Sequence, residues 1–450
     1  MPSATLSRWT MSYFAAACLM LLAGQGLMVA GYGYPAAAIN APETLALVHV
    51  VAIGWLSLLM VGALLQFVPV LIARPLVGAR LAAPALVLLL AGLSFLVSGF
   101  VALSGALDLS LNLLPLGGGI LLLGFALIAG LLAATLHAAR PLPLPARFVA
   151  VALVALVAAI LIGVAFTLAL SGLWESAALA RLVASGVELH AALGLGGWLS
   201  ITAIGVSYRL LAMFLLAPEV ERRTSHAVWW TAALAAGLIA MAVVLMLFAF
   251  PGVSVLFAAA LLLTLAAVLL YGGDVLHLYR SRKRKKAELN IRASLPAFVA
   301  LAISLVLVNV PAIRAGDGVA AVVYLFTFGW LSGLGLAQLY KIVAFLTWLE
   351  AYGPVLGRAP VPRVQDLVEE RRAHTLFLLY YGAVAAATAA LLAAMPDMFR
   401  GAVCLQLVAT LALMREFVRA RRLSVVPAAL RPPEGTVRPH LFLPLSASRR

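Results

Sequence analysis

Residues 46–69 read ALVHVVAIGWLSLLMVGALLQFVP. This stretch has one ionisable side chain, His49, near its start, and it is then largely apolar for about the thickness of a bilayer. Its tetrad Gly-Trp-Leu-Ser, at residues 54–57, returns at residues 197–200 and 329–332. Three copies of one tetrad in a single chain predict an internal repeat.

The similarity between the three copies continues downstream of the tetrad. Eight residues after the tetrad glycine lie Gly62, Gly205 and Ala337, and four residues further lie Gln66, Arg209 and Lys341. A spacing of four residues places each small residue and its polar partner on one face of a helix. We therefore expect a pseudo-threefold repeat of helices centred on residues 44–74, 185–217 and 318–351.

The composition excludes a soluble protein. The chain is 65% hydrophobic and 10% charged, with a mean hydropathy of +1.11, whereas soluble domains average about 25% charged residues. Apolar runs long enough for membrane helices recur along the chain, without the alternation typical of a barrel. We predict an all-α polytopic membrane protein with about twelve transmembrane helices over residues 11–418, a cytoplasmic lead at 1–10 and a basic, Pro-rich tail at 419–450. Disorder is expected from residue 423 onward.

The placement of the positive charge predicts the orientation. The chain has 31 Lys and Arg, and its net charge is +15. With both termini on one side, nearly all of these residues fall on that side. The exceptions are Arg181, Arg314 and Arg400 on the other side, and Arg209 and Lys341 within spans. Cytoplasmic loops of membrane proteins are enriched in Lys and Arg, so we expect cytoplasmic termini in a bacterial inner membrane. The basic run at 280–286 then faces anionic lipid rather than nucleic acid.

Two of the seven histidines stand apart from the others. Only His49 and His190 enter apolar spans from the outer side, each within about two turns of the start of its span. In the third copy, Val322 and Tyr324 occupy the corresponding positions. An ionisable residue in a membrane is a functional candidate, and neutral imidazole suits heme iron or copper. The alternative is that each histidine is neutral and bonded to a neighbouring helix.

Further polar residues are secondary candidates. Glu188 lies two residues before His190, on a different helix face, and either takes part in a site or lies in water at the outer rim. Arg209 and Lys341 should reach the inner membrane face and pair there with lipid phosphate or Glu219. Gln66 belongs with them if the repeat lines an inward vestibule.

The repeat and its histidines resemble subunit I of the heme–copper oxidase superfamily, especially its C-family cytochrome oxidases and nitric oxide reductases. In that family the second helix carries a histidine ligand of the low-spin heme, and His49, followed by Gly54 and Pro69, is similar to it. The sixth helix of the family carries a copper-ligand histidine, and His190, followed by Gly197, is similar to that.

The departures from the family pattern limit what the resemblance implies. The family has a histidine pair in its seventh helix, but here the seventh span has only His226, at the wrong end. The family has His-x-His before the Gly-Trp of its tenth helix, where this chain has Val322 and Tyr324. A binuclear oxygen-reducing centre with copper is therefore not expected. The resemblance implies at most one heme b, held by His49 alone, with Tyr324, or with a repositioned His190.

Three functions stay open at this point. The first is a single-heme protein that either passes electrons or senses a diatomic gas. Its electrons would come from a redox partner such as quinol or cytochrome c. Alternatively, it is a cofactor-free transporter or scaffold that uses Gln66, Arg209 and Lys341. A third reading is a copper-handling protein that uses His190 and Glu188, with Met60 or Met213 deeper in the spans. A partner subunit that supplies missing ligands is compatible with the first.

Overall fold

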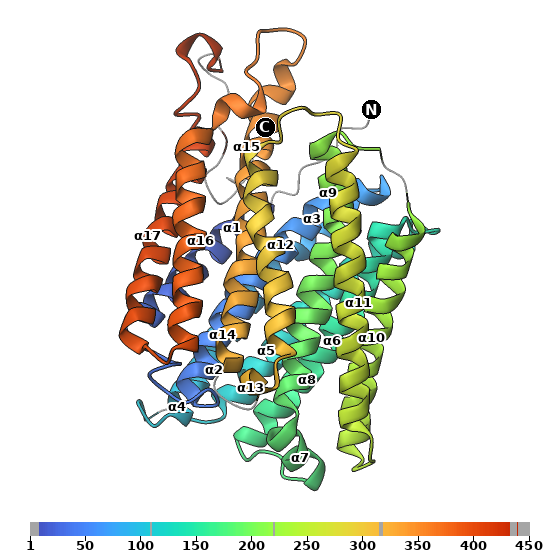
Figure 1. Cartoon of the computed structure of the whole chain (residues 1–450), viewed down its shortest axis with the longest axis vertical. Coiled ribbons are helices and arrows are strands. Elements are labelled where there is room, and N and C mark those ends of the chain that lie inside the picture. The colour runs from blue at the N-terminus through green and yellow to red at the C-terminus, as the bar shows by residue number, and fades with distance from the viewer. Residues whose placement is uncertain (1–8, 109, 219–220, 315–317, 433–438, 440–450) are drawn as a thin grey trace. The chain divides into compact units, whose positions relative to one another are not determined.

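A computed structural model describes residues 9–108, 110–218, 221–314, 318–432 and 439. Within those residues, twelve helices are long and apolar enough to cross a membrane (Figure 1). The prediction of an all-α polytopic membrane protein is confirmed. The expected lead at 1–10 lies almost entirely outside the described residues.

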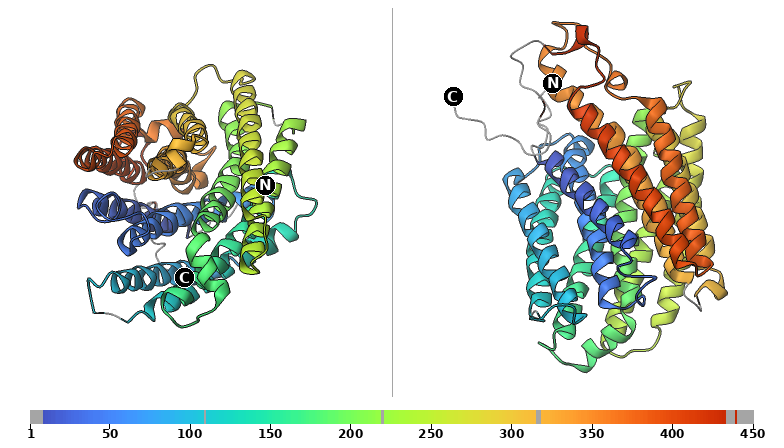
Figure 2. Two further views of the ribbon diagram at one scale, coloured as in Figure 1. Left: turned by 60° about the horizontal axis from the view of Figure 1, so that its bottom comes forward. Right: turned by 90° about the vertical axis from the view of Figure 1, so that its left-hand side faces the viewer.

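The helices separate into two compact units. The first unit, Asn40–Lys286, contains α2 (Pro42–His49), η1 (Val50–Ser57), α3 (Leu58–Ile72), α4 (Ala82–Leu103), α5 (Leu113–His137), α6 (Leu144–Leu170), α7 (Ala177–Ser185), α8 (Val187–Ala191), η3 (Ala192–Ser200), α9 (Ile201–Leu215), α10 (Arg223–Leu247) and α11 (Val253–Arg280). The second unit contains α1 (Thr10–Val29), α12 (Leu289–Val308), α13 (Pro311–Arg314), α14 (Gly318–Tyr324), η4 (Leu325–Ser332), α15 (Gly333–Tyr352), α16 (Glu370–Leu392) and α17 (Pro396–Arg421). In the second unit α16 and α17 lie side by side in both views of Figure 2 and in Figure 1, and α1 packs against α17. A single transmembrane domain over residues 11–418 stays a prediction.

Three spans contain a π-helix, and each π-helix ends in a Gly-Trp-Leu-Ser tetrad. The π-helices are η1, η3 and η4. The tetrad serines, Ser57, Ser200 and Ser332, each donate a hydrogen bond to the carbonyl oxygen five residues earlier, at 2.7–2.9 Å. A widened π-turn places that carbonyl within reach of the hydroxyl, and such segments are frequent at functional sites. The same local geometry thus follows the same tetrad in all three places.

Small residues allow helices of the first unit to approach closely. A Cβ atom added at Gly205 of α9 would lie 2.3 Å from Cβ of Phe148 in α6. A Cβ atom at Gly117 of α5 would lie 2.5 Å from the backbone nitrogen of Leu96 in α4. In membrane helices, contact of this kind is a main source of packing energy, because lipid competes for any apolar surface.

The end of the chain is ordered further than the sequence predicts. Leu423 and Val426 are buried in a cluster with Tyr352 and Leu367 of the second unit. The hydroxyl of Tyr352 also donates a hydrogen bond to the carbonyl of Leu430 at 3.1 Å. Disorder from residue 423 was therefore the wrong expectation for residues 423–430, because Leu423 and Val426 are buried and Tyr352 bonds to Leu430. Most of the tail beyond them lies outside the described residues.

Candidate functional site

His49 is the last residue of α2 and lies directly before η1. Its Nδ1 atom is 2.7 Å from the carbonyl oxygen of Leu45, one turn earlier. A carbonyl only accepts, so Nδ1 carries the proton and Nε2 of a neutral ring keeps its lone pair. This is the arrangement of a histidine that ligates a metal through Nε2, with a backbone carbonyl fixing its orientation.

His190, in α8, lies next to His49 within the first unit. The two ring centroids are 6.4 Å apart, and the ring planes differ by 29°. Both residues are half-buried. The two histidines that the sequence places at equal depth are thus brought together.

Aromatic and small residues surround the pair. Phe100 of α4 lies 5.3 Å from the His49 ring, and Phe166 of α6 meets the His190 ring edge-on at 5.7 Å. Gly163 of α6 leaves room for His190, since a Cβ atom there would lie 3.4 Å from Cε1 of the ring. The surroundings of the pair are therefore apolar.

The His190 ring is not fully satisfied by the protein. Its Nδ1 atom is buried and has no hydrogen bond of normal geometry within the described part of the chain. The carbonyl of Ala159 in α6 still interacts with the ring. An unsatisfied buried nitrogen costs about 1–3 kcal/mol.

A buried hydrogen bond ties the two histidine-bearing spans together. The indole Nε1 of Trp198, in η3, donates to Oγ of Ser57, in η1, at 3.1 Å. Ser57 in turn donates to the carbonyl of Ala52. Since both partners lie eight residues after their histidines, this bond fixes the relative height of the two spans and so of the two rings.

The spacing of the rings fits two ligands on one metal ion. Imidazole nitrogens bind metals at about 2 Å, so two rings on opposite sides of one ion have centroids roughly 6 Å apart. Within the described residues, no group of three or more His, Cys, Asp or Glu could hold a metal ion. Glu188 is exposed. Two ligands alone suit a metal whose other positions are filled by a macrocycle.

Tyr324, in the second unit, is buried and has a different environment. Its hydroxyl donates to the side-chain oxygen of Gln406, and its ring packs against Phe328 and Phe399. Gln406 is fully buried, as is Gln25, which donates to Thr410 at 3.1 Å. Sequence reasoning missed these amides, although an amide within an apolar span was the available signal.

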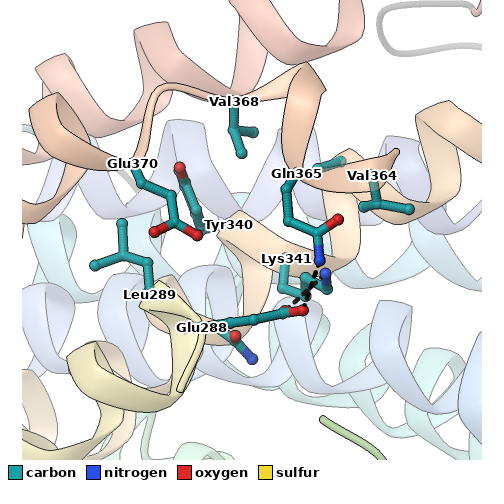
Figure 3. Close-up of a pocket in the computed structure, with 10 residues that line it drawn as sticks. Glu288, Leu289, Tyr340, Lys341, Val364, Gln365, Val368 and Glu370 are labelled. Carbon is teal, nitrogen blue, oxygen red and sulfur yellow. Dashed lines mark hydrogen bonds and ion pairs between the residues drawn. The ribbon is translucent and has the colours of Figure 1, made fainter. Parts of the chain in front are cut away.

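Lys341 of α15 has an acidic partner that was not predicted. Its Nζ lies 2.7 Å from Oε2 of Glu288, and the two side chains are 13% and 9% exposed. Figure 3 shows Lys341 and Gln365 both pointing toward the Glu288 carboxylate, and the Gln365 amide donates to Oε1 of Glu288 at 2.8 Å. The adjoining cavity, which Tyr340 also lines, has about 10 Å³ of free space, enough for a single water molecule. Lys341 thus belongs to a buried ion pair.

The other polar candidates lie in the first unit. Gln66 on α3 and Arg209 on α9 are half-buried, and Glu219 lies outside the described residues. Next to Arg209, the hydroxyl of Tyr208 donates to the buried Asp274 at 2.9 Å, and Arg222 pairs with the same carboxylate at 2.6 Å. This group ties α9, α10 and α11 together.

Comparison with known proteins adds no assignment. No family model matches the chain, and no curated protein matches its sequence.

Proposed function

We propose that this membrane protein binds one heme b between His49 and His190 and passes single electrons through it. The observation that carries the proposal is the pair of rings 6.4 Å apart, one of them holding Nε2 free through its bond to Leu45. When bound, heme b supplies a reversible one-electron iron couple and four ligand nitrogens. His49 and His190 would hold the iron of that heme.

The surroundings of the pair support heme over a bare ion. Phe100 and Phe166 offer apolar contact to a flat ring system, and among the described residues no third His, Cys, Asp or Glu joins the pair. With both histidines bound to the iron, no position would be left open for a diatomic gas. Electron transfer is thus favoured over gas sensing and over copper handling.

The resemblance to the oxidase family, with its pseudo-threefold repeat, is part of the same proposal. Three π-helices end in the same Gly-Trp-Leu-Ser tetrad. This shared feature supports the origin of the three spans from one duplicated helix. With cytoplasmic termini in a bacterial inner membrane, the two histidines lie toward the outer face. The redox partner is then a quinol in the bilayer or a cytochrome c outside it.

An absorption spectrum tests this function. Protein purified from cells supplied with heme should show a Soret band, a sharp α-band on reduction, and about one heme per chain. His49→Ala and His190→Ala should each abolish the six-coordinate low-spin signature, because each removes one axial ligand. His137→Ala, at the exposed end of α5, is the matched control and should leave the spectrum unchanged.

Two results would contradict the proposal. A heme-free protein from heme-supplied cells rules out the site, provided that the protein is folded by circular dichroism. Carbon monoxide binding by the reduced wild type, as strong as that of His190→Ala, rules out the two-histidine ligation.

A further inference from the structure

A second site lies where α6 begins, in the first unit. A groove of about 780 Å³ is lined by one face of α6 and by Trp229 of α10. On α6 the groove follows Arg147, Val151 and Val154, which recur at helical spacing and therefore share a face. Val154 is 71% exposed, and Leu161, two turns further, is 53% exposed. One end of the groove is cationic, and the other opens onto an apolar helix surface.

The cationic end has unused hydrogen-bond donors. Arg147 donates through Nε to the carbonyl of Leu142 at 2.9 Å, which fixes the guanidinium, and its terminal nitrogens have no partner among the described residues. Arg140 is exposed and forms no ion pair with any described residue. Nε1 of Trp229 is buried and bonds to no described group. Arg140 in the α5–α6 loop, Arg147 of α6 and Trp229 of α10 thus line one groove, and each keeps a donor without an acceptor among the described residues.

The acidic side chain beside the start of α6 has other partners. Glu221 accepts a hydrogen bond from the backbone nitrogen of Leu144 at 3.1 Å, and its other oxygen lies 3.3 Å from Nε2 of His226. The residues that line the groove include Arg140 and Arg147 and no acidic side chain, so the lining carries a net positive charge.

We propose that this groove is a binding site for an anionic phospholipid. The phosphate is held by Arg140, Arg147 and the indole N–H of Trp229, and an acyl chain lies along the Val151–Val154 face. Guanidinium groups recognise phosphate in fixed geometry, and an indole suits the boundary between headgroup and acyl chain. The exposed apolar face beyond the arginines commits the site to a lipid rather than to a free anion.

Native mass spectrometry of the full chain in detergent tests the site. The protein is titrated with phosphatidylglycerol and, separately, with phosphatidylcholine of the same acyl chains. The wild type should retain the anionic lipid preferentially. Replacing both arginines (Arg140→Gln with Arg147→Gln) should weaken phosphatidylglycerol binding by about 30-fold, since each basic residue near anionic lipid contributes about fivefold.

The controls separate this site from general surface charge. Arg74→Gln with Arg80→Gln removes two exposed arginines from the same unit and should leave binding within about twofold of wild type. Trp229→Phe keeps the ring and removes the N–H, and should weaken phosphatidylglycerol binding several-fold.

Three results would overturn the proposal. The first is equal retention of the two lipids by the wild type. The second is equal loss in both double-arginine variants, and the third is displacement of phosphatidylglycerol by inorganic phosphate at millimolar concentration. Size-exclusion chromatography and circular dichroism check that each variant is monodisperse and helical. If the double-arginine variant does not fold, Trp229→Phe still tests the site.

Discussion

Replacing Lys341 by methionine should destabilise the second unit strongly, because the change leaves Glu288 without its lysine. The two charges are 2.7 Å apart and only 13% and 9% exposed. Breaking a buried ion pair on one side costs about 3–5 kcal/mol, because the remaining charge stays desolvated. Glu288 keeps its hydrogen bond from Gln365, and a hydrogen bond to a charged group is worth about 1.5–3 kcal/mol. The expected loss for Lys341→Met is therefore near the lower limit, about 3 kcal/mol.

A double-mutant cycle measures this interaction directly. Glu288→Gln alone should cost about 2 kcal/mol, and the double variant should recover most of the loss, since no buried charge is left. The coupling energy should then be at least about 2 kcal/mol. Unfolding is followed by circular dichroism as SDS is added to the protein in mixed micelles. Arg371→Met, at an exposed position of α16, is the control and should change stability by less than about 0.5 kcal/mol.

The refuting result is additivity. If the losses of Glu288→Gln and Lys341→Met simply sum in the double variant, the two side chains do not act as a buried pair.

Two further predictions concern packing in the first unit. Gly205→Ala should destabilise the protein by about 1–3 kcal/mol in the same SDS titration, because its new Cβ would lie 2.3 Å from Phe148. Gly194→Ala is the control: a Cβ atom there meets no atom within 4 Å, so stability should change by less than about 1 kcal/mol. Equal losses in both variants would contradict close packing at Gly205. Ser57→Ala should cost about 1–3 kcal/mol by removing the acceptor of the Trp198 indole, and Ser94→Ala, at an exposed serine, should cost almost nothing. A loss at Ser57 no larger than at Ser94 would show that the bond does not hold the two spans.

The twelve spans could be predicted because each one is a local property of the chain. A helix that crosses a bilayer needs about 20 consecutive apolar residues, and such a run is visible without knowledge of its neighbours. The tetrads were visible for the same reason, although nothing in them indicated that each ends a π-helix. The burial of Leu423 and Val426 was missed because it depends on Tyr352, far away in the chain.

The candidate site was predictable only in part. The spacing of His49 and His190 from the tetrads gave a shared depth in the membrane, and the structure places their rings 6.4 Å apart. Phe100 and Phe166 could not be identified as their neighbours, since both lie in apolar spans with many similar residues. The pairing of Lys341 with Glu288 was missed because Glu288 follows a run of cations and reads as part of a solvated loop.

Hydropathy and charge along the chain were enough to establish a helical membrane protein, to count its spans and to single out two histidines. They act through the lipid and water around each segment, which do not depend on which helices become neighbours. The rotation of each helix about its axis does depend on its neighbours, through close contacts such as Gly205 with Phe148 and through the Trp198–Ser57 bond. That rotation decides which side chains meet, and so the histidine pair, the Lys341–Glu288 ion pair and the arginine-lined groove became visible only in the folded chain.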